Sequence, residues 1–140
     1  MPTSVETVLL DTSAALALIQ QDHRFHDQVF AAVVIRRRGL AGHTWFETYS
    51  VLTRLPPPQR LSAADAARIL NGNFPATHYL SAKVTADLTA TFPTAGVTGG
   101  SVYDALVAAA ALDAGLTLVS CDGRAAGTYA ALGARVELIR

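Results

Sequence analysis

The sequence predicts an α/β fold, a three-layer sandwich with a mostly parallel central sheet flanked by helices. Two observations predict it: strands alternate with helices along the chain, and the strands are short apolar runs of the kind buried on both faces. Alternation implies right-handed crossovers that place helices on both sides of the sheet. With 140 residues, 51% of them hydrophobic, the chain is predicted to form one ordered domain, 1–140.

The first half of the chain contains two predicted strands and four predicted helices. In order they are a strand at 7–10, helices at 14–19 and 24–38, a strand at 40–42, and helices at 44–55 and 61–71. Apolar residues recur at helical spacing before Gly39, which is expected to stop the second helix. Three prolines, 56–58, end the helix before them and mark an exposed connection, and Ser62 is the expected N-cap of the next helix.

The second half repeats the alternation. It contains a weak strand at 77–80, a helix at 82–91, a loop at 93–100, a helix at 101–114, a strand at 116–119, and a last helix and strand. The helix at 101–114 carries the longest apolar run, which is far shorter than the roughly 20 residues that span a bilayer. We therefore expect no membrane segment.

Charge and cysteine content limit the possible partners and the compartment. Eleven basic and eleven acidic residues cancel, so no overall field draws the chain to a polyanion, which must be held by local contacts. The single cysteine, Cys121, excludes an internal disulfide, and no basic signal region opens the chain. These features favour the cytoplasm.

Four acidic residues are predicted to meet at one edge of the sheet. Asp11 and Asp122 follow apolar strands, and ligands of open parallel sheets bind beyond the carboxyl ends of the strands. Glu47 and Asp104 lie in the first turns of helices that can start along the same edge. Crowding of four carboxylates predicts that at least one has a raised pKa.

Helix capping is the alternative explanation for two of these acids. In a capping box, a serine or threonine precedes an acid by three positions at a helix start, and three segments fit this pattern: Thr44 to Glu47, Ser101 to Asp104, and Ser62 to Asp65. Taken one at a time, capping is the favoured interpretation. The third segment has no assigned chemistry and serves as an internal comparison.

Four segments, in this order, resemble the motifs of PIN-domain nucleases, specifically VapC-type toxins. They are Val8-Leu9-Leu10-Asp11-Thr12-Ser13, Phe46-Glu47 followed by Leu52, Tyr103-Asp104-Ala105-Leu106-Val107-Ala108-Ala109, and Leu118-Val119-Ser120-Cys121-Asp122. The third is the most specific match. The family usually has threonine where Ser120 stands, and serine keeps the hydroxyl.

The resemblance implies a divalent-metal-dependent endoribonuclease, the toxin of a VapBC-type pair, that hydrolyses RNA phosphodiester bonds. Hard oxygen ligands suit Mg²⁺ or Mn²⁺, and no histidine or cysteine cluster suits zinc. Asp11 and Asp104 are the expected metal ligands, whereas Glu47 and Asp122 are expected to bind a second ion or orient the water. The resemblance also implies a homodimer and a cognate antitoxin, a segment of which occupies the acidic site.

Other polar residues have two possible roles each. Thr12 and Ser13 are predicted to contact the carboxylates or the phosphate, or else to cap the next helix. Arg124, close to Asp122, either contacts a phosphate or is simply solvated. The triplet 36–38 either contacts RNA or complements a helix dipole, and the dipole is favoured.

Several non-polar residues are expected in the core rather than in a site. They are Trp45, Phe46, Tyr49 and Cys121, because aromatic residues around a helix start and a small residue after a buried strand are usually packed inside. The alternative function for the whole chain is a catalytically silent PIN-like module that binds RNA or a protein.

Overall fold

A computed structural model describes residues 5–140, so the first four residues of the predicted domain lie outside its described part. A parallel four-stranded sheet with the order β2-β1-β3-β4 forms the centre. Its strands are β1 (Thr7–Leu10), β2 (Arg37–Leu40), β3 (Thr117–Ser120) and β4 (Val136–Leu138). The helices are α1 (Thr12–Ile19), α2 (His26–Val33), α3 (Thr44–Arg54), α4 (Ala63–Asn73), α5 (Ala82–Ala95), α6 (Ser101–Ala114) and α7 (Ala126–Ala131).

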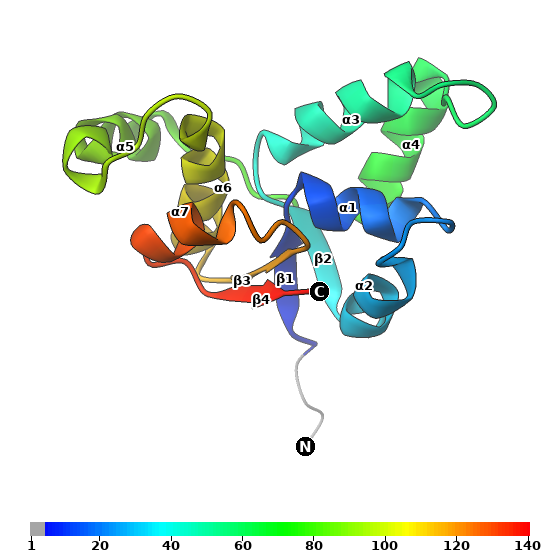
Figure 1. Cartoon of the computed structure of the whole chain (residues 1–140), viewed down its shortest axis with the longest axis horizontal. Helices are drawn as coiled ribbons and strands as arrows, with labels where there is room; N and C mark the ends of the chain where they lie inside the picture. The colour runs from blue at the N-terminus through cyan, green and yellow to red at the C-terminus, as the bar shows by residue number, and fades with distance from the viewer. Residues whose placement is uncertain (1–4) are drawn as a thin grey trace.

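Helices cover both faces of this sheet, which confirms the predicted three-layer α/β sandwich (Figure 1). Successive side chains of a strand point to opposite faces, so Val8 and Leu10 pack with α1 to α4 while Leu9 packs with α6 and α7. All three side chains are fully buried. β1 is therefore the centre of the core, and its carboxyl end is held rigidly on both sides.

The helix predicted at 24–38 is wrong in its second half. α2 ends at Val33, and the chain then enters β2, which pairs with β1. Gly39 does not stop a helix; a Cβ there would overlap the backbone of Ala76, which runs alongside the strand. The helical spacing of the apolar residues ends at Val34, and the residues after it pair as a strand of the sheet; close backbone approach explains the glycine.

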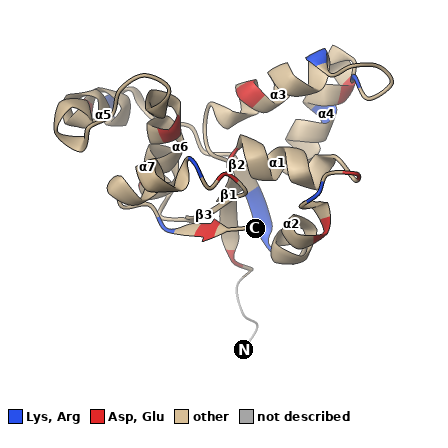
Figure 2. Cartoon of the chain, in the orientation of Figure 1, with Lys and Arg blue, Asp and Glu red and all other residues tan. Residues whose placement is uncertain are grey.

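The arginine triplet therefore lies outside the helix, in the turn that follows α2 and at the start of β2. Arg37 and Arg38 open β2, and Arg36 donates to Glu137 at 2.6 Å and lies 3.5 Å from Glu6. Since β2 runs from these residues toward the acidic edge, the triplet lies at the opposite edge of the sheet. Arg38 nevertheless donates from Nη1 to the carbonyl of Val33, the last residue of α2, at 3.2 Å, so the favoured helix-end interpretation holds for this one arginine. Figure 2 shows lysines and arginines spread over several elements rather than gathered on one.

Three other boundaries also differ from the prediction. The strand predicted at 40–42 is shifted toward the N-terminus, and the weak strand at 77–80 is reduced to a bridge between Ala41 and His78. α5 continues through Pro93 and ends at Gly96, whose φ of 69° is the left-handed conformation that glycine favours. Among residues 5–140, no helix is both long enough and apolar enough to cross a membrane.

Candidate active site

Sheet register brings the first and fourth acids together. β1 lies between β2 and β3, with Leu10 beside both Leu40 and Val119, so the residues that follow β1 and β3 leave the sheet at one edge. Asp11 follows β1 directly and Asp122 follows β3 after one intervening residue. Asp11 is also the N-cap of α1, because its side chain accepts a hydrogen bond from the backbone N–H of Ala14 at 3.0 Å.

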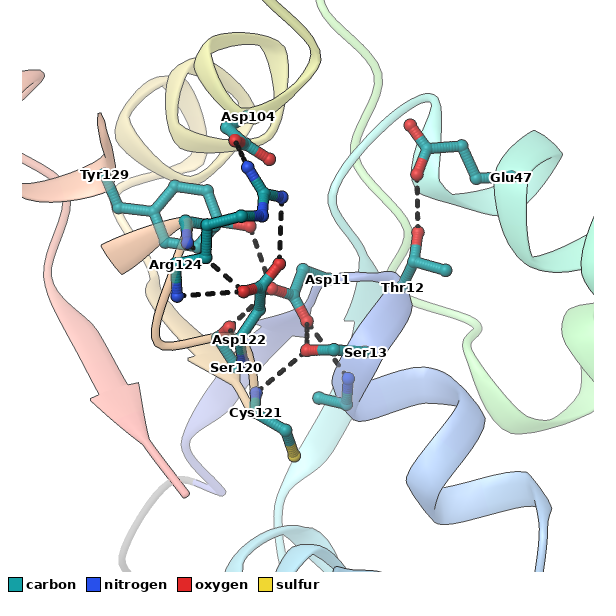
Figure 3. A network of polar contacts seen from close by, with 12 residues as sticks. Asp11, Thr12, Ser13, Glu47, Asp104, Ser120, Cys121, Asp122, Arg124 and Tyr129 are labelled. Atoms are coloured by element: carbon teal, nitrogen blue, oxygen red, sulfur yellow. Dashed lines mark hydrogen bonds and ion pairs between the residues drawn. The ribbon is translucent and has the colours of Figure 1, made fainter. Parts of the chain in front are cut away.

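Asp11 is buried, with 3% of its surface exposed, and its carboxylate is surrounded by hydroxyl donors. The hydroxyls of Ser120 and Tyr129 donate to Oδ2 at 2.5 and 2.8 Å, and the hydroxyl of Ser13 donates to Oδ1 at 2.6 Å (Figure 3). Burial raises the pKa of Asp11, and these hydrogen bonds oppose the rise only in part. No arginine, lysine or histidine of the described residues forms an ion pair with it.

Asp104 and Asp122 share one cation, Arg124. Its Nη1 lies 3.3 Å from Asp104 Oδ2 and its Nη2 lies 3.1 Å from Asp122 Oδ2 (Figure 3). The two carboxylates, Asp122 more than Asp104, raise the pKa of the Arg124 guanidinium. The arginine side chain is 71% exposed, so it bridges the two acids from the solvent side.

Glu47 lies across the cavity, on α3, and belongs to a separate pair of contacts. Its Oε2 accepts a hydrogen bond from Thr12 Oγ1 at 2.8 Å (Figure 3). Its Oε1 lies 2.6 Å from Nε2 of His43. The contact with His43 lowers the pKa of Glu47; Thr12 adds to this effect and partial burial opposes it. Thr12 therefore connects α1 to the acid of α3.

The capping interpretation is wrong for Glu47 and Asp104. No side chain caps the N-terminus of α3 or of α6, and both acids point to other partners. At α4, by contrast, the hydroxyl of Ser62 accepts a hydrogen bond from the backbone N–H of Asp65 at 3.1 Å. The segment without assigned chemistry is thus the one that contains the predicted N-cap.

The four acids line one cavity of about 100 Å³. Among residues 5–140, no three acidic, histidine or cysteine side chains lie close enough together to hold a metal ion as they stand. The guanidinium of Arg124 contacts both Asp104 and Asp122. The donor set nevertheless suits a hard divalent cation: it consists of carboxylate oxygens, and the buried Asp11 has no cationic partner. The chemistry of these donors therefore fits a hard divalent cation such as Mg²⁺ or Mn²⁺.

Two residues of this network were not found from the sequence. His43 precedes Glu47 by four positions, a spacing that places two side chains side by side on a helix and could have identified the pair. Tyr129, which is 2% exposed, gave no local signal, because its partner lies 118 positions away in the sequence.

Predicted core positions around the site are mostly correct. Trp45, Tyr49 and Cys121 are partly buried and pack against the core, and burial raises the pKa of the Cys121 thiol to about 11. Phe46 is an exception, because 61% of its surface is exposed. Its ring lines a larger cleft that shares Glu47 with the acidic cavity.

Comparisons with known proteins agree with this architecture. The PIN domain family matches residues 8–130. The crystal structure of FitAcB from Neisseria gonorrhoeae has the same fold, with a TM-score of 0.67 over 92% of this chain and 95% of that chain at 18% identity. The chain belongs to the PIN domain family.

Two relatives define the branch. Ribonuclease VapC27 of Mycobacterium tuberculosis is 44% identical over 127 residues, which cover 91% of this chain and 93% of the relative. Ribonuclease VapC40 of the same organism is 42% identical over 135 residues, which cover 92% and 96%. Within the PIN domain family, the chain therefore groups with the VapC-type ribonucleases.

Proposed function

We propose that this chain is a divalent-metal-dependent endoribonuclease, the toxin of a VapBC-type pair, formed by a single PIN-like domain. One observation carries the proposal: acids from four separate segments line a single cavity at the carboxyl end of the sheet. Glu47 and Asp104, which the sequence also fitted to capping boxes, do not cap their helices. High identity to ribonucleases over nearly the whole chain supports the same conclusion.

In this proposal Asp11 and Asp104 hold Mg²⁺ or Mn²⁺, while Glu47 and Asp122 hold a second ion or orient the attacking water. When bound, the metal polarises the phosphate, lowers the pKa of water and neutralises charge as the phosphodiester bond is hydrolysed. The remaining chemistry is positioning by the protein's own side chains.

The hydroxyl residues fix the direction of the carboxylates. Ser13 and Ser120 each donate to one oxygen of Asp11, so its carboxylate cannot rotate freely. Thr12 holds one oxygen of Glu47 in the same way. We assign Arg124 to the phosphate, because its guanidinium is exposed, lies beside two of the acids, and can donate two parallel hydrogen bonds to phosphate oxygens.

We further propose that the protein acts in the cytoplasm as a homodimer and is inhibited by a cognate antitoxin that occupies the acidic cavity. The resemblance to VapC-type toxins supports these partners. Light scattering of the purified chain, alone and with the co-expressed antitoxin, measures the mass of the homodimer and of the complex. A monomer that does not bind the antitoxin would contradict this part of the proposal.

Asp104→Asn tests the reaction, because it preserves size but removes one charged ligand. We expect RNA cleavage to fall by at least about 100-fold while the fold, followed by circular dichroism, is retained. The matched control is Asp65→Asn, which changes an acid at the first turn of α4, outside the cavity. It should cut at the wild-type rate in Mg²⁺ and in Mn²⁺.

Two results would overturn the proposal. Equal cleavage by wild type and Asp104→Asn, with contaminating nuclease excluded, would remove Asp104 from the site. RNA binding by the wild type without cleavage in either metal would instead indicate the catalytically silent binding module.

A further inference from the structure

A second, larger cleft of about 590 Å³ opens above the acidic cavity, between α3 and the N-terminal end of α6. It shares Thr12, Glu47, Tyr103, Asp104 and Arg124 with the cavity, so the two spaces are continuous. A chain of nucleotides whose phosphate lies at the acids can therefore extend into this cleft.

Two exposed aromatic side chains line the cleft. Phe46 on α3 and Tyr103 on α6 are each 61% exposed, and each directly precedes one of the four acids. Neighbouring rings cover only part of each one. Phe46 meets Trp45 edge-on at 5.5 Å between centroids and lies 6.4 Å from Tyr79, and Tyr103 lies 6.3 Å from His43. Aromatic surface thus remains open to a ligand beside the acids.

A cation lies farther along the same cleft. Arg54 lines it from the last turn of α3, seven positions after Glu47, which corresponds to about 10 Å along the helix. The arginine is exposed, and within residues 5–140 it has neither an ion-pair nor a hydrogen-bond partner. It is therefore available to a phosphate other than the one at the acids.

We propose that this cleft is a binding site for an unpaired stretch of RNA, in which bases stack on Phe46 and Tyr103 while Arg54 holds a neighbouring phosphate. The inference rests on the proposed function, since it places the scissile phosphate at the acids. Base faces are covered by their neighbours in a duplex, so stacking on a protein ring requires bases that are unpaired and splayed apart.

The composition of the cleft favours RNA over a protein partner. Aromatic rings interleaved with cations are the combination that binds single strands, because rings take the bases and cations take the backbone. The net charge of the chain is zero, so such local contacts have to supply the affinity. At one end the cleft reaches the carboxylates that suit a metal and a phosphate, so a strand bound in the cleft would lead to the proposed cleavage site.

The test measures RNA binding with a chelator present, so that nothing is cut. Fluorescence anisotropy with a labelled single strand should show about tenfold weaker binding for Phe46→Ala and for Tyr103→Ala, and wild-type binding for Tyr103→Phe, which keeps the ring. Arg54→Gln should bind more weakly and show a reduced dependence on salt. The same strand annealed to its complement should bind at least about tenfold more weakly than the free strand.

Two variants outside the cleft serve as controls. Phe30→Ala removes a 48% exposed ring from α2, and Arg68→Gln removes a cation from α4; both should bind like wild type. Three results would overturn the inference: no binding of the single strand, equal binding of the duplex, or unchanged affinity in both alanine variants. The last would assign the two rings to a protein partner.

The binding experiment separates this inference from the proposed function. Normal aromatic-dependent binding by a protein that cuts nothing in Mg²⁺ or Mn²⁺ would preserve the RNA cleft and overturn the nuclease. Cleavage that depends on Asp104 but not on either ring would do the reverse.

Discussion

Asp11 and Glu47 line the same cavity, but the protein holds them in opposite ways. Asp11 is buried in the floor, caps α1 and accepts hydrogen bonds from hydroxyls on three segments, with no cation in contact. Glu47 stands on a half-exposed helix face with a histidine at 2.6 Å. As a result the pKa of Asp11 is raised and that of Glu47 is lowered.

The two acids differ in how strongly each would be stabilised by a bound cation. A buried ionised carboxylate is costly, and the hydroxyls that surround Asp11 compensate only in part, so a bound cation would stabilise it strongly. Glu47 is less buried and already has a close contact with His43, so it gains less from a cation. The two acids should therefore respond differently to substitution, to loss of a hydroxyl and to pH.

The largest difference is expected in catalysis. Asp11→Asn removes the buried ligand, and cleavage should fall by more than about 100-fold, whereas Glu47→Gln should cost about 10- to 100-fold because the acid helps from the rim. Single-turnover cleavage of one RNA by both variants measures the ratio. If the two variants lost the same activity, Asp11 and Glu47 would contribute equally to cleavage, contrary to this prediction.

Loss of a hydroxyl should separate the two acids in stability. Tyr129→Phe removes a buried hydrogen bond to a charged group, so the free energy of unfolding should fall by about 1.5–3 kcal/mol at neutral pH. Thr12→Val removes the hydroxyl that serves Glu47 and should cost about 1 kcal/mol or less, because water can replace it. Urea unfolding of both variants gives the comparison, and a larger loss in Thr12→Val would contradict it.

The position of Asp11 was easier to predict from the sequence than the residues that hold its carboxylate. Asp11 ends an apolar run, and strand order alone brings such ends to one edge, so its place followed from local pattern and general rules. Tyr129 could not be found, because its contact depends on how α7 returns over the sheet. Crowding of acids was the predicted cause of a raised pKa, but the main cause at Asp11 is burial, a property of packing.

Boundaries were wrong where tertiary contacts outweighed local pattern. The helical spacing upstream ends at Val34, and the predicted helix was extended past it to Arg38; that extension instead pairs with β1, because a central strand needs neighbours on both sides. Capping boxes at Glu47 and Asp104 were plausible locally, and only the position of those helices around a cavity turned both acids away from the helix ends. A sequence pattern records the local options; the packed chain selects among them.

Without metal, the free energy of unfolding should respond to falling pH in opposite directions for the two acids. The raised folded-state pKa of Asp11 means that the folded chain binds more protons than the unfolded chain, so stability rises as pH falls from neutral through that pKa toward about 3.9. The lowered pKa of Glu47 means that stability is lost as pH falls from about 4.3 through its folded-state pKa. Urea unfolding across this range should show a rise followed by a loss.

The two substitutions assign each part of that profile. Asp11→Asn should flatten the rise on the neutral side, and Glu47→Gln should weaken the loss on the acidic side. A rise that persists in Asp11→Asn would mean that another group, and not the buried acid, carries the proton.

The smallest expected effect concerns Arg124, which connects the two regions by bridging Asp104 and Asp122. A metal that takes oxygens from these acids has to replace the guanidinium, and exposed ion pairs contribute little because solvent screens them, so Arg124→Ala should bind Mn²⁺ tighter by at most about fivefold. The same variant should cut RNA more slowly, since a phosphate contact is lost. Tighter metal binding together with slower cleavage would indicate a residue that competes with the ion and contacts the substrate.

Calorimetric titration of Mn²⁺ and single-turnover cleavage measure the two effects. The control is Arg135→Ala, which removes a cation bound to the carbonyl of Gly115 and should change neither. Weaker Mn²⁺ binding by Arg124→Ala would show instead that the arginine holds the two acids in place for the ion.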